Sequence, residues 1–167
     1  EIVKNLNQEV KKKFLMRGFH TGYGNEIKKK IAERFPETKF SEEGSTLYND
    51  LCQNTLCVVS YNGTPILEAI AADYPVLAQW DPKVWSIRPA ARSIFKKMFD
   101  AGIFFYDPKE LSKKVNEVYT DPVEWWNSPG VRDAKEVFRE EFALTTPGWM
   151  KIWREELRTL RKHAHSC

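Results

Sequence analysis

The sequence predicts an α/β protein with a doubly wound, Rossmann-like sheet of mostly parallel strands, flanked by helices and followed by a helical C-terminal extension. Short apolar segments alternate with segments of helical periodicity, and such alternation requires crossover connections that make neighbouring strands parallel. The turn sequence 61–64 links the most apolar strand to a helix near Pro65. With 167 residues, 42% hydrophobic and 13% aromatic, the chain can bury one core without disulfides.

In the first half of the chain, helices and strands are expected in turn. The periodicity of residues 2–10 predicts a helix, and the apolar run 13–17 predicts a strand that ends before Gly18. The next elements are a helix over 26–35 stopped by Pro36, a brief strand over 38–40, a helix from a cap at Ser45 to Cys52, and a strand over 56–60.

The second half begins with a helix over 65–72, for which Thr64 is the predicted cap and Pro65 the first residue. The elements that follow are a strand over 75–80, a helix over 88–99, a strand over 103–106 and a helix opened by Asp107-Pro108. Beyond Pro122 the chain reads as helical, with breaks at Gly130 and at 146–148. We therefore expect a Rossmann-like domain over 1–121 and a helical extension over 122–167.

The charge and the composition bear on which ligands the chain can bind and where the protein is expected in the cell. A net charge of +3 is too small to indicate nucleic acid binding. Residues 40–82 contain no Lys or Arg, so an anion bound there would be held by backbone donors or by the basic segments on either side. The three cysteines lack metal-site spacing, and no metal is predicted. Without a signal peptide or an apolar run of about 18 residues, a cytoplasmic protein is expected.

The loop before the helix at Pro65 is the sharpest candidate for a binding site. In the turn formed by Asn62 and Gly63, Gly63 allows a close approach to the backbone, and the amides that start the helix attract phosphate. Thr64 adds a hydroxyl donor, and Glu68, one turn later on the same face, could accept hydrogen bonds from a ribose. The alternative is that residues 62–63 form only a turn and that Glu68 only favours the helix start.

A second candidate loop follows the strand predicted at 13–17. Arg17 offers a planar fork of donors to phosphate, His20 offers a proton or a hydrogen bond, and Tyr23 lies in the same loop. A lone histidine in a loop is more often incidental. The sequence contains no nucleophile–base pair or carboxylate pair with diagnostic spacing, so catalytic residues are not predicted.

A third candidate segment, 80–88, leaves the strand predicted at 75–80. Trp80 and Trp85 could stack on a base or sugar, and Arg88 could contact a phosphate. The alternative, that burial of the tryptophans pins the loop, stays open. The later tryptophans at 125–126 and 149–153 have helical spacing and are expected to pack against other parts of the protein.

The blocks Val58 to Ala71 and Tyr74 to Leu77 resemble the donor-binding half of GT-B glycosyltransferases. The first block has the strand, the small-residue loop and the Leu-Glu-Ala motif of that half, and the second has its Pro-Val strand. Residues 80–85, 101–104 and 123–127 are similar to bacterial transferases of surface-carbohydrate biosynthesis. The resemblance runs from about Arg17 to Phe142.

This resemblance implies a C-terminal domain that binds a nucleotide-sugar donor, with no cofactor or metal. The donor would lie against Asn62, Gly63 and Thr64, with its ribose near Glu68. A saccharide or lipid-linked acceptor would bind an N-terminal half that is absent here, and the chain alone would scarcely catalyse. The extension over 122–167 would pack on the Rossmann-like domain or run toward that N-terminal half. Contact with the inner face of the membrane and a homodimer formed through the exposed C-terminal helices are further expectations. Alternatives are a non-catalytic α/β ligand-binding or interaction module and a nucleotide-sugar epimerase-like domain.

Overall fold

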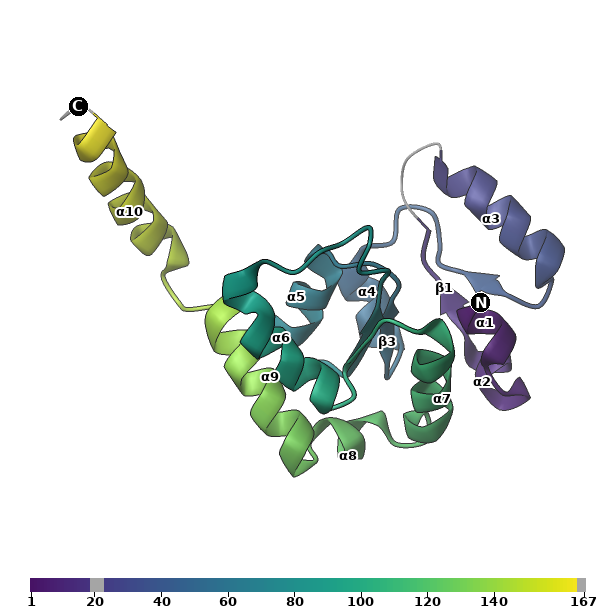
Figure 1. Cartoon of the computed structure of the whole chain (residues 1–167). Helices are drawn as coiled ribbons and strands as arrows, with labels where there is room; N and C mark the ends of the chain where they lie inside the picture. The colour runs from purple at the N-terminus through teal and green to yellow at the C-terminus, as the bar shows by residue number, and fades with distance from the viewer. Residues whose placement is uncertain (19–22, 165–167) are drawn as a thin grey trace.

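The computed structural model describes residues 1–18 and 23–164, with side chains over 1–18 and 26–158. The fold is mixed α/β, with short parallel sheets flanked by helices (Figure 1). The larger sheet has the strand order β3-β4-β5, and the smaller one pairs β1 with β2. Their bounds are β1 (Leu15–Met16), β2 (Lys39–Phe40), β3 (Cys57–Val59), β4 (Val76–Gln79) and β5 (Phe104–Phe105).

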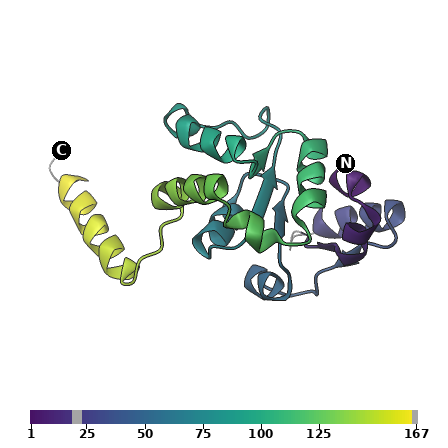
Figure 2. The same cartoon turned by 90° about the horizontal axis from the view of Figure 1, so that it is seen from below.

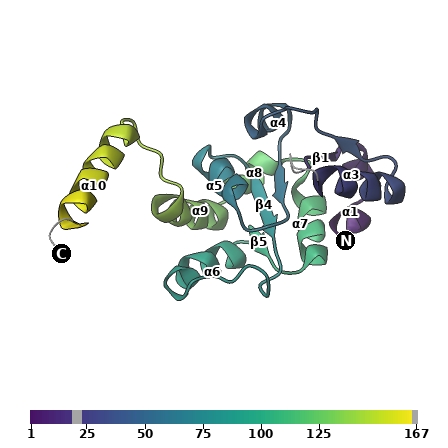
Figure 3. The same ribbon diagram turned by 90° about the horizontal axis from the view of Figure 1, so that it is seen from above.

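Helices cover both faces of the three-stranded sheet (Figure 3). On β4, Val76 and Ala78 point to one core cluster and Leu77 to the other, as strand alternation requires. The first face is covered by α5 (Thr64–Ala71), α6 (Arg92–Asp100) and α9 (Pro129–Phe142). The second face is covered by α1 (Ile2–Asn5), α2 (Gln8–Lys13) and α7 (Pro108–Val118).

The remaining helices lie at the periphery of this arrangement. They are α3 (Tyr23–Arg34), α4 (Leu47–Gln53), the single 3-10 turn η1 (Pro89–Ala91), α8 (Pro122–Trp126) and α10 (Trp149–Ala164). Trp126 of α8 and Phe138 of α9 are buried in the same core as the sheet. Helix α10 instead projects from the folded body (Figure 2).

The described residues do not show one continuous doubly wound sheet. The strands form two separate parallel sheets, and within the larger sheet the spatial order follows the chain order, without a reversal. Strands β1 and β2 contribute only two residues each, which limits the ladder to Leu15 opposite Lys39 and Met16 opposite Phe40. All three strand pairs are parallel, so the α/β class and the parallel pairing are confirmed.

Several helix boundaries differ from the sequence prediction. The helix expected over 2–10 is two helices, because the Asn7 side chain accepts a hydrogen bond from the Val10 amide at 2.8 Å and starts α2. Thr46, and not Ser45, caps α4. Gly130 does not break a helix, since it lies inside α9, which begins after Ser128.

A polar cluster ties α8 and α9 to the turn between α5 and β4. Asp73, at a φ of 52°, accepts hydrogen bonds from Lys135 Nζ at 2.7 Å and from Trp126 Nε1 at 2.9 Å. The same ammonium group lies 4.7 Å from the centre of the Trp126 ring system. Asp73 precedes β4, so this cluster is at the edge of the sheet opposite the carboxyl ends of the strands.

Candidate functional site

The loop between β3 and α5 leaves backbone donors unused. Helix α5 begins at Thr64 and its N-cap is Gly63, so the predicted start is wrong by one residue and Thr64 is not the cap. Gly63 has no side chain to accept a hydrogen bond, and its carbonyl accepts from the Ile66 amide at 3.1 Å. Within the described part of the chain, the amides of Gly63 and Thr64 and the side chains of Asn62 and Thr64 form no hydrogen bond. These are the groups that the sequence assigned to a phosphate.

Gly63 is needed here because the ring of Tyr61 lies against its Cα. A Cβ at position 63 would be 2.4 Å from Tyr61 Cε2 and 2.8 Å from Cδ2, so the Tyr61 ring or the backbone would have to shift to admit one. The φ of −161° is extended backbone, so left-handed conformation is not the reason for glycine. The close approach that Gly63 allows is therefore made by an aromatic ring of the protein itself.

Arg17, at the carboxyl end of β1, is held by an ion pair with Asp50 of α4. Its Nη1 donates to Asp50 Oδ2 at 2.6 Å, and both side chains are largely buried. Asp50 also accepts hydrogen bonds from the hydroxyls of Ser41 and Ser45, each at 2.8 Å. Partial burial alone would raise the pKa of Asp50, but these three donors outweigh it and lower that pKa. The carboxylate of Asp50, which two serine hydroxyls also hold, is thus the counter-ion of Arg17. The sequence did not predict this ion pair.

The charges of Arg17 and Glu68 both act on the phenol of Tyr61, although the three residues come from different parts of the chain. Burial raises the pKa of Tyr61, the negative charge of Glu68 raises it further, and the positive charge of Arg17 lowers it. Both charges are therefore close enough to act on the phenol. Glu68 itself is exposed, on the first two turns of α5. Arg17 and Glu68 thus both lie within electrostatic range of Tyr61, the residue directly before Asn62, Gly63 and Thr64.

Trp80 does not have the predicted role. Its side chain is 1% exposed and cannot stack on a ligand, because core rings surround it. Those rings are Phe95, Phe99, Phe104 and Tyr106, with centroids 5.2 to 6.1 Å away. Among the described residues its Nε1 has no hydrogen-bond partner. The alternative of burial is therefore the right one for this tryptophan.

Trp85 and Arg88 lie on the surface loop that leaves β4. Trp85 is 44% exposed, and its amide donates to the Asp81 carbonyl at 3.0 Å. Arg88 is also exposed and directly precedes η1. Since β3 and β4 are parallel neighbours, this loop and the loop before α5 leave the same edge of the sheet. Both residues stay candidates for contact with a ligand at that edge.

Two of the predicted side chains lie outside the described ones. His20 falls in the segment 19–22, and Tyr23 is the first residue of α3 but its side chain is not described. Over the described residues there is no group of three or more His, Cys, Asp or Glu side chains that could hold a metal ion. None of the described helices has the length and apolar character to cross a bilayer.

Sequence reasoning missed two residues of this region. Asp50, which holds Arg17, had no recognisable motif, although Ser45 five residues earlier marked a helix start. Tyr61 was treated as part of a turn, although a large ring two residues before a glycine is a sign that the glycine makes room.

The comparison with protein families identifies the chemistry class. The family model described as LIC12162 family transferase matches residues 1–157. The chain belongs to this family. The family match covers every element just described up to the first half of α10, including the loop before α5 and the Arg17–Asp50 pair. Searches of curated proteins and of solved structures find no match. As a member of a transferase family, the chain carries a role in group transfer.

Proposed function

We propose that this transferase chain is the nucleotide-sugar binding domain of a glycosyltransferase of bacterial surface-carbohydrate biosynthesis. The observation that carries the proposal is the set of donors at Gly63 and Thr64 that form no hydrogen bond among the described residues, with Arg17 and Glu68 within electrostatic range of the adjoining Tyr61. A diphosphate or monophosphate needs donors and positive charge, and a ribose needs an acceptor. The edge formed by the carboxyl ends of parallel strands is where α/β proteins bind such ligands. The resemblance of residues 58–71 to GT-B donor-binding halves supports the same assignment.

In the proposed reaction the protein stabilises the leaving group. The departing nucleotide gathers negative charge on its phosphate oxygens as the glycosidic bond breaks. The amides at the start of α5 and the guanidinium of Arg17 supply fixed positive charge at that place, which is worth more in the transition state than in the ground state. Asp50 would position the guanidinium, and Glu68 would bind the ribose hydroxyls.

The same proposal concerns the parts of the enzyme that this chain does not supply. The acceptor, a saccharide or a lipid-linked saccharide, would bind a separate N-terminal half, which would also carry the catalytic base. Strands β1 and β2 would extend the larger sheet beyond β3 to make a doubly wound order β2-β1-β3-β4-β5. The nearness of Arg17, at the end of β1, to Tyr61, after β3, supports this arrangement.

Calorimetry of the 167-residue chain with a panel of nucleoside diphosphates, nucleoside monophosphates and nucleotide sugars tests the proposal. One ligand should bind, and Glu68→Ala and Thr64→Val should each weaken it by about tenfold or more, since each removes a hydrogen-bonding group that would contact the ribose or the phosphate. Glu110→Ala changes an exposed glutamate on another helix, α7, so it is the control variant and should bind normally. If no nucleotide binds, or if the Glu68 and Thr64 variants bind like the parent chain, the site assignment is wrong.

A further inference from the structure

Helix α10 carries an apolar surface that nothing in the described protein covers. The helix follows a loop in which Gly148 adopts a φ of 80°, and it extends away from the sheet (Figures 1 and 3). Five apolar side chains of this one helix are each at least half exposed, namely Trp149, Met150, Ile152, Trp153 and Leu157. So many large apolar groups on one exposed helix indicate an interaction surface.

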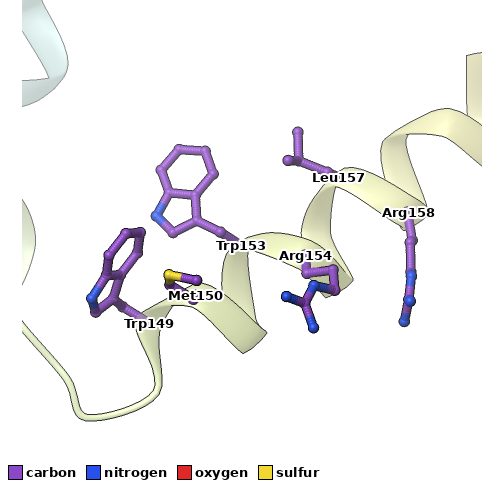
Figure 4. A pocket seen from close by; sticks show the side chains of 6 residues that line it. All are labelled: Trp149, Met150, Trp153, Arg154, Leu157 and Arg158. Atoms are coloured by element: carbon purple, nitrogen blue, oxygen red, sulfur yellow. The ribbon is translucent and has the colours of Figure 1, made fainter.

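The helix has two distinct sides. Trp149, Trp153 and Leu157 recur every four residues and therefore lie along one stripe. Arg154 and Arg158 recur at the same interval and form a basic flank beside it. Figure 4 shows Trp153 and Leu157 on one side of the ribbon and Arg158 on the other. A shallow groove runs between the stripe and the flank, and its lining residues all belong to α10.

The charge of the helix indicates what kind of surface it meets. Its sequence contains five Lys or Arg residues and two Glu residues, which leaves a net charge of +3. A second copy of the chain would bring the same positive charge against it, whereas a surface rich in anionic lipid would complement it. Indole rings are also suited to the boundary between headgroups and acyl chains, because each has an apolar body and one N–H donor.

We propose that α10 lies in the plane of an anionic lipid bilayer, with Trp149, Trp153 and Leu157 at the level of the acyl chains and Arg154 and Arg158 at the phosphate headgroups. Amphipathic helices that combine a strongly polar side, a basic flank and tryptophan on the apolar side bind membranes in this way. The loop at 144–148 allows the helix to lie on a bilayer without disturbing the core, which ends at Ala143. This surface is separate from the proposed nucleotide site and does not depend on it.

Co-sedimentation of the full 167-residue chain with lipid vesicles tests the proposal. The chain should bind vesicles that contain about a third phosphatidylglycerol, bind phosphatidylcholine vesicles weakly, and lose affinity as salt rises. Arg154→Glu with Arg158→Glu should weaken binding by about 25-fold or more, from about fivefold for each basic residue removed. Trp149→Ala with Trp153→Ala should weaken it by about tenfold or more.

Matched variants elsewhere on the surface distinguish vesicle binding by α10 from nonspecific binding by other exposed charged or apolar residues. Lys29→Glu with Lys30→Glu makes the same change in charge on α3, and Tyr48→Ala with Val123→Ala removes two other exposed apolar side chains. Both controls should bind vesicles like the parent chain. The proposal is overturned if the parent does not bind anionic vesicles, if it binds neutral vesicles equally well, or if the controls lose as much affinity as the α10 variants. A dimer that is lost in the Trp149 and Trp153 variant, without vesicle binding, would assign the surface to a second copy.

Discussion

Replacing Asp73 with asparagine should destabilise the protein much more than removing its partner Lys135. The two members of this ion pair differ in exposure, since the Lys135 side chain is 4% exposed and the Asp73 side chain 60%. Loss of the carboxylate leaves a buried ammonium ion without a counter-ion, and a break of this kind costs about 3–5 kcal/mol in a fully buried pair. The asparagine oxygen still accepts from Lys135 and Trp126, so we expect a loss of about 2–3 kcal/mol. Asparagine also tolerates the positive φ at this position, so backbone strain does not add to the loss of stability.

The matched variant is Lys135→Met, which removes the buried charge and keeps a side chain of similar length. It leaves behind an exposed carboxylate that water can solvate, so the expected loss is about 1 kcal/mol or less. For a chain of this size, the asparagine variant should melt roughly 4–12 °C lower and the methionine variant at most roughly 4 °C lower. Equal losses, or a larger loss for Lys135→Met, would refute the reasoning from exposure.

The same pair makes a prediction about pH. Partial burial would raise the pKa of Asp73, but the hydrogen bonds from Lys135 and Trp126 outweigh it, and the pKa in the folded protein is lowered from 3.8. A lowered folded pKa means that the stabilisation is complete above about 3.8 and is lost as the pH falls through the folded value. Melting temperatures of the parent and the Asp73→Asn variant should therefore converge in strong acid and differ fully at about pH 7. A difference that stays constant down to the lowest pH would contradict this origin.

Two further predictions concern the core and the loop before α5. Trp80→Ala should lower the free energy of unfolding, measured in urea, by about 3–5 kcal/mol because it creates a cavity among four rings. Trp85→Ala, at an exposed position, should lower it by no more than about 0.5 kcal/mol. Similar losses for the two variants would contradict the burial of Trp80. Gly63→Ala should cost about 1–3 kcal/mol in the parent chain and much less in a chain that already carries Tyr61→Ala, because the ring is the obstacle. Gly130→Ala, where a Cβ meets nothing, should be neutral or stabilising by up to about 1 kcal/mol, and a loss as large as that of Gly63→Ala would refute the contact.

The order of helices and strands could be predicted because it depends on local periodicity. Each predicted strand is present and shorter by one to three residues, since the ladder pairs only the central residues of each apolar run. The errors lie at the starts of helices. Asn7 starts a new helix inside a periodic segment, and a single-residue shift made Gly63 the cap in place of Thr64. Such choices depend on hydrogen bonds that the pattern does not specify.

The candidate site could be predicted in its loops but not in its partners. The residues at 62–64 and Glu68 were found because a turn between a strand and a helix has a recognisable spacing. The pairing of Arg17 with Asp50 spans 33 residues, and no local pattern contains it. The burial of Trp80 depends on the rings of Phe95, Phe99 and Phe104, whose positions are set by the packing of the whole core. The sequence alone therefore could not choose between burial and stacking.

Helices α9 and α10 show what periodicity leaves open. Both sequences place apolar residues on one side of a helix, and the tryptophans at 149 and 153 were expected to pack. In α9 this side is buried, because Phe138 and Phe142 meet Phe95 of α6 at ring distances of 5.3 and 5.8 Å. In α10 the corresponding residues, Trp149 and Trp153, remain 58% and 62% exposed. An amphipathic pattern therefore predicts that a helix has an apolar side but not whether the rest of the chain covers it.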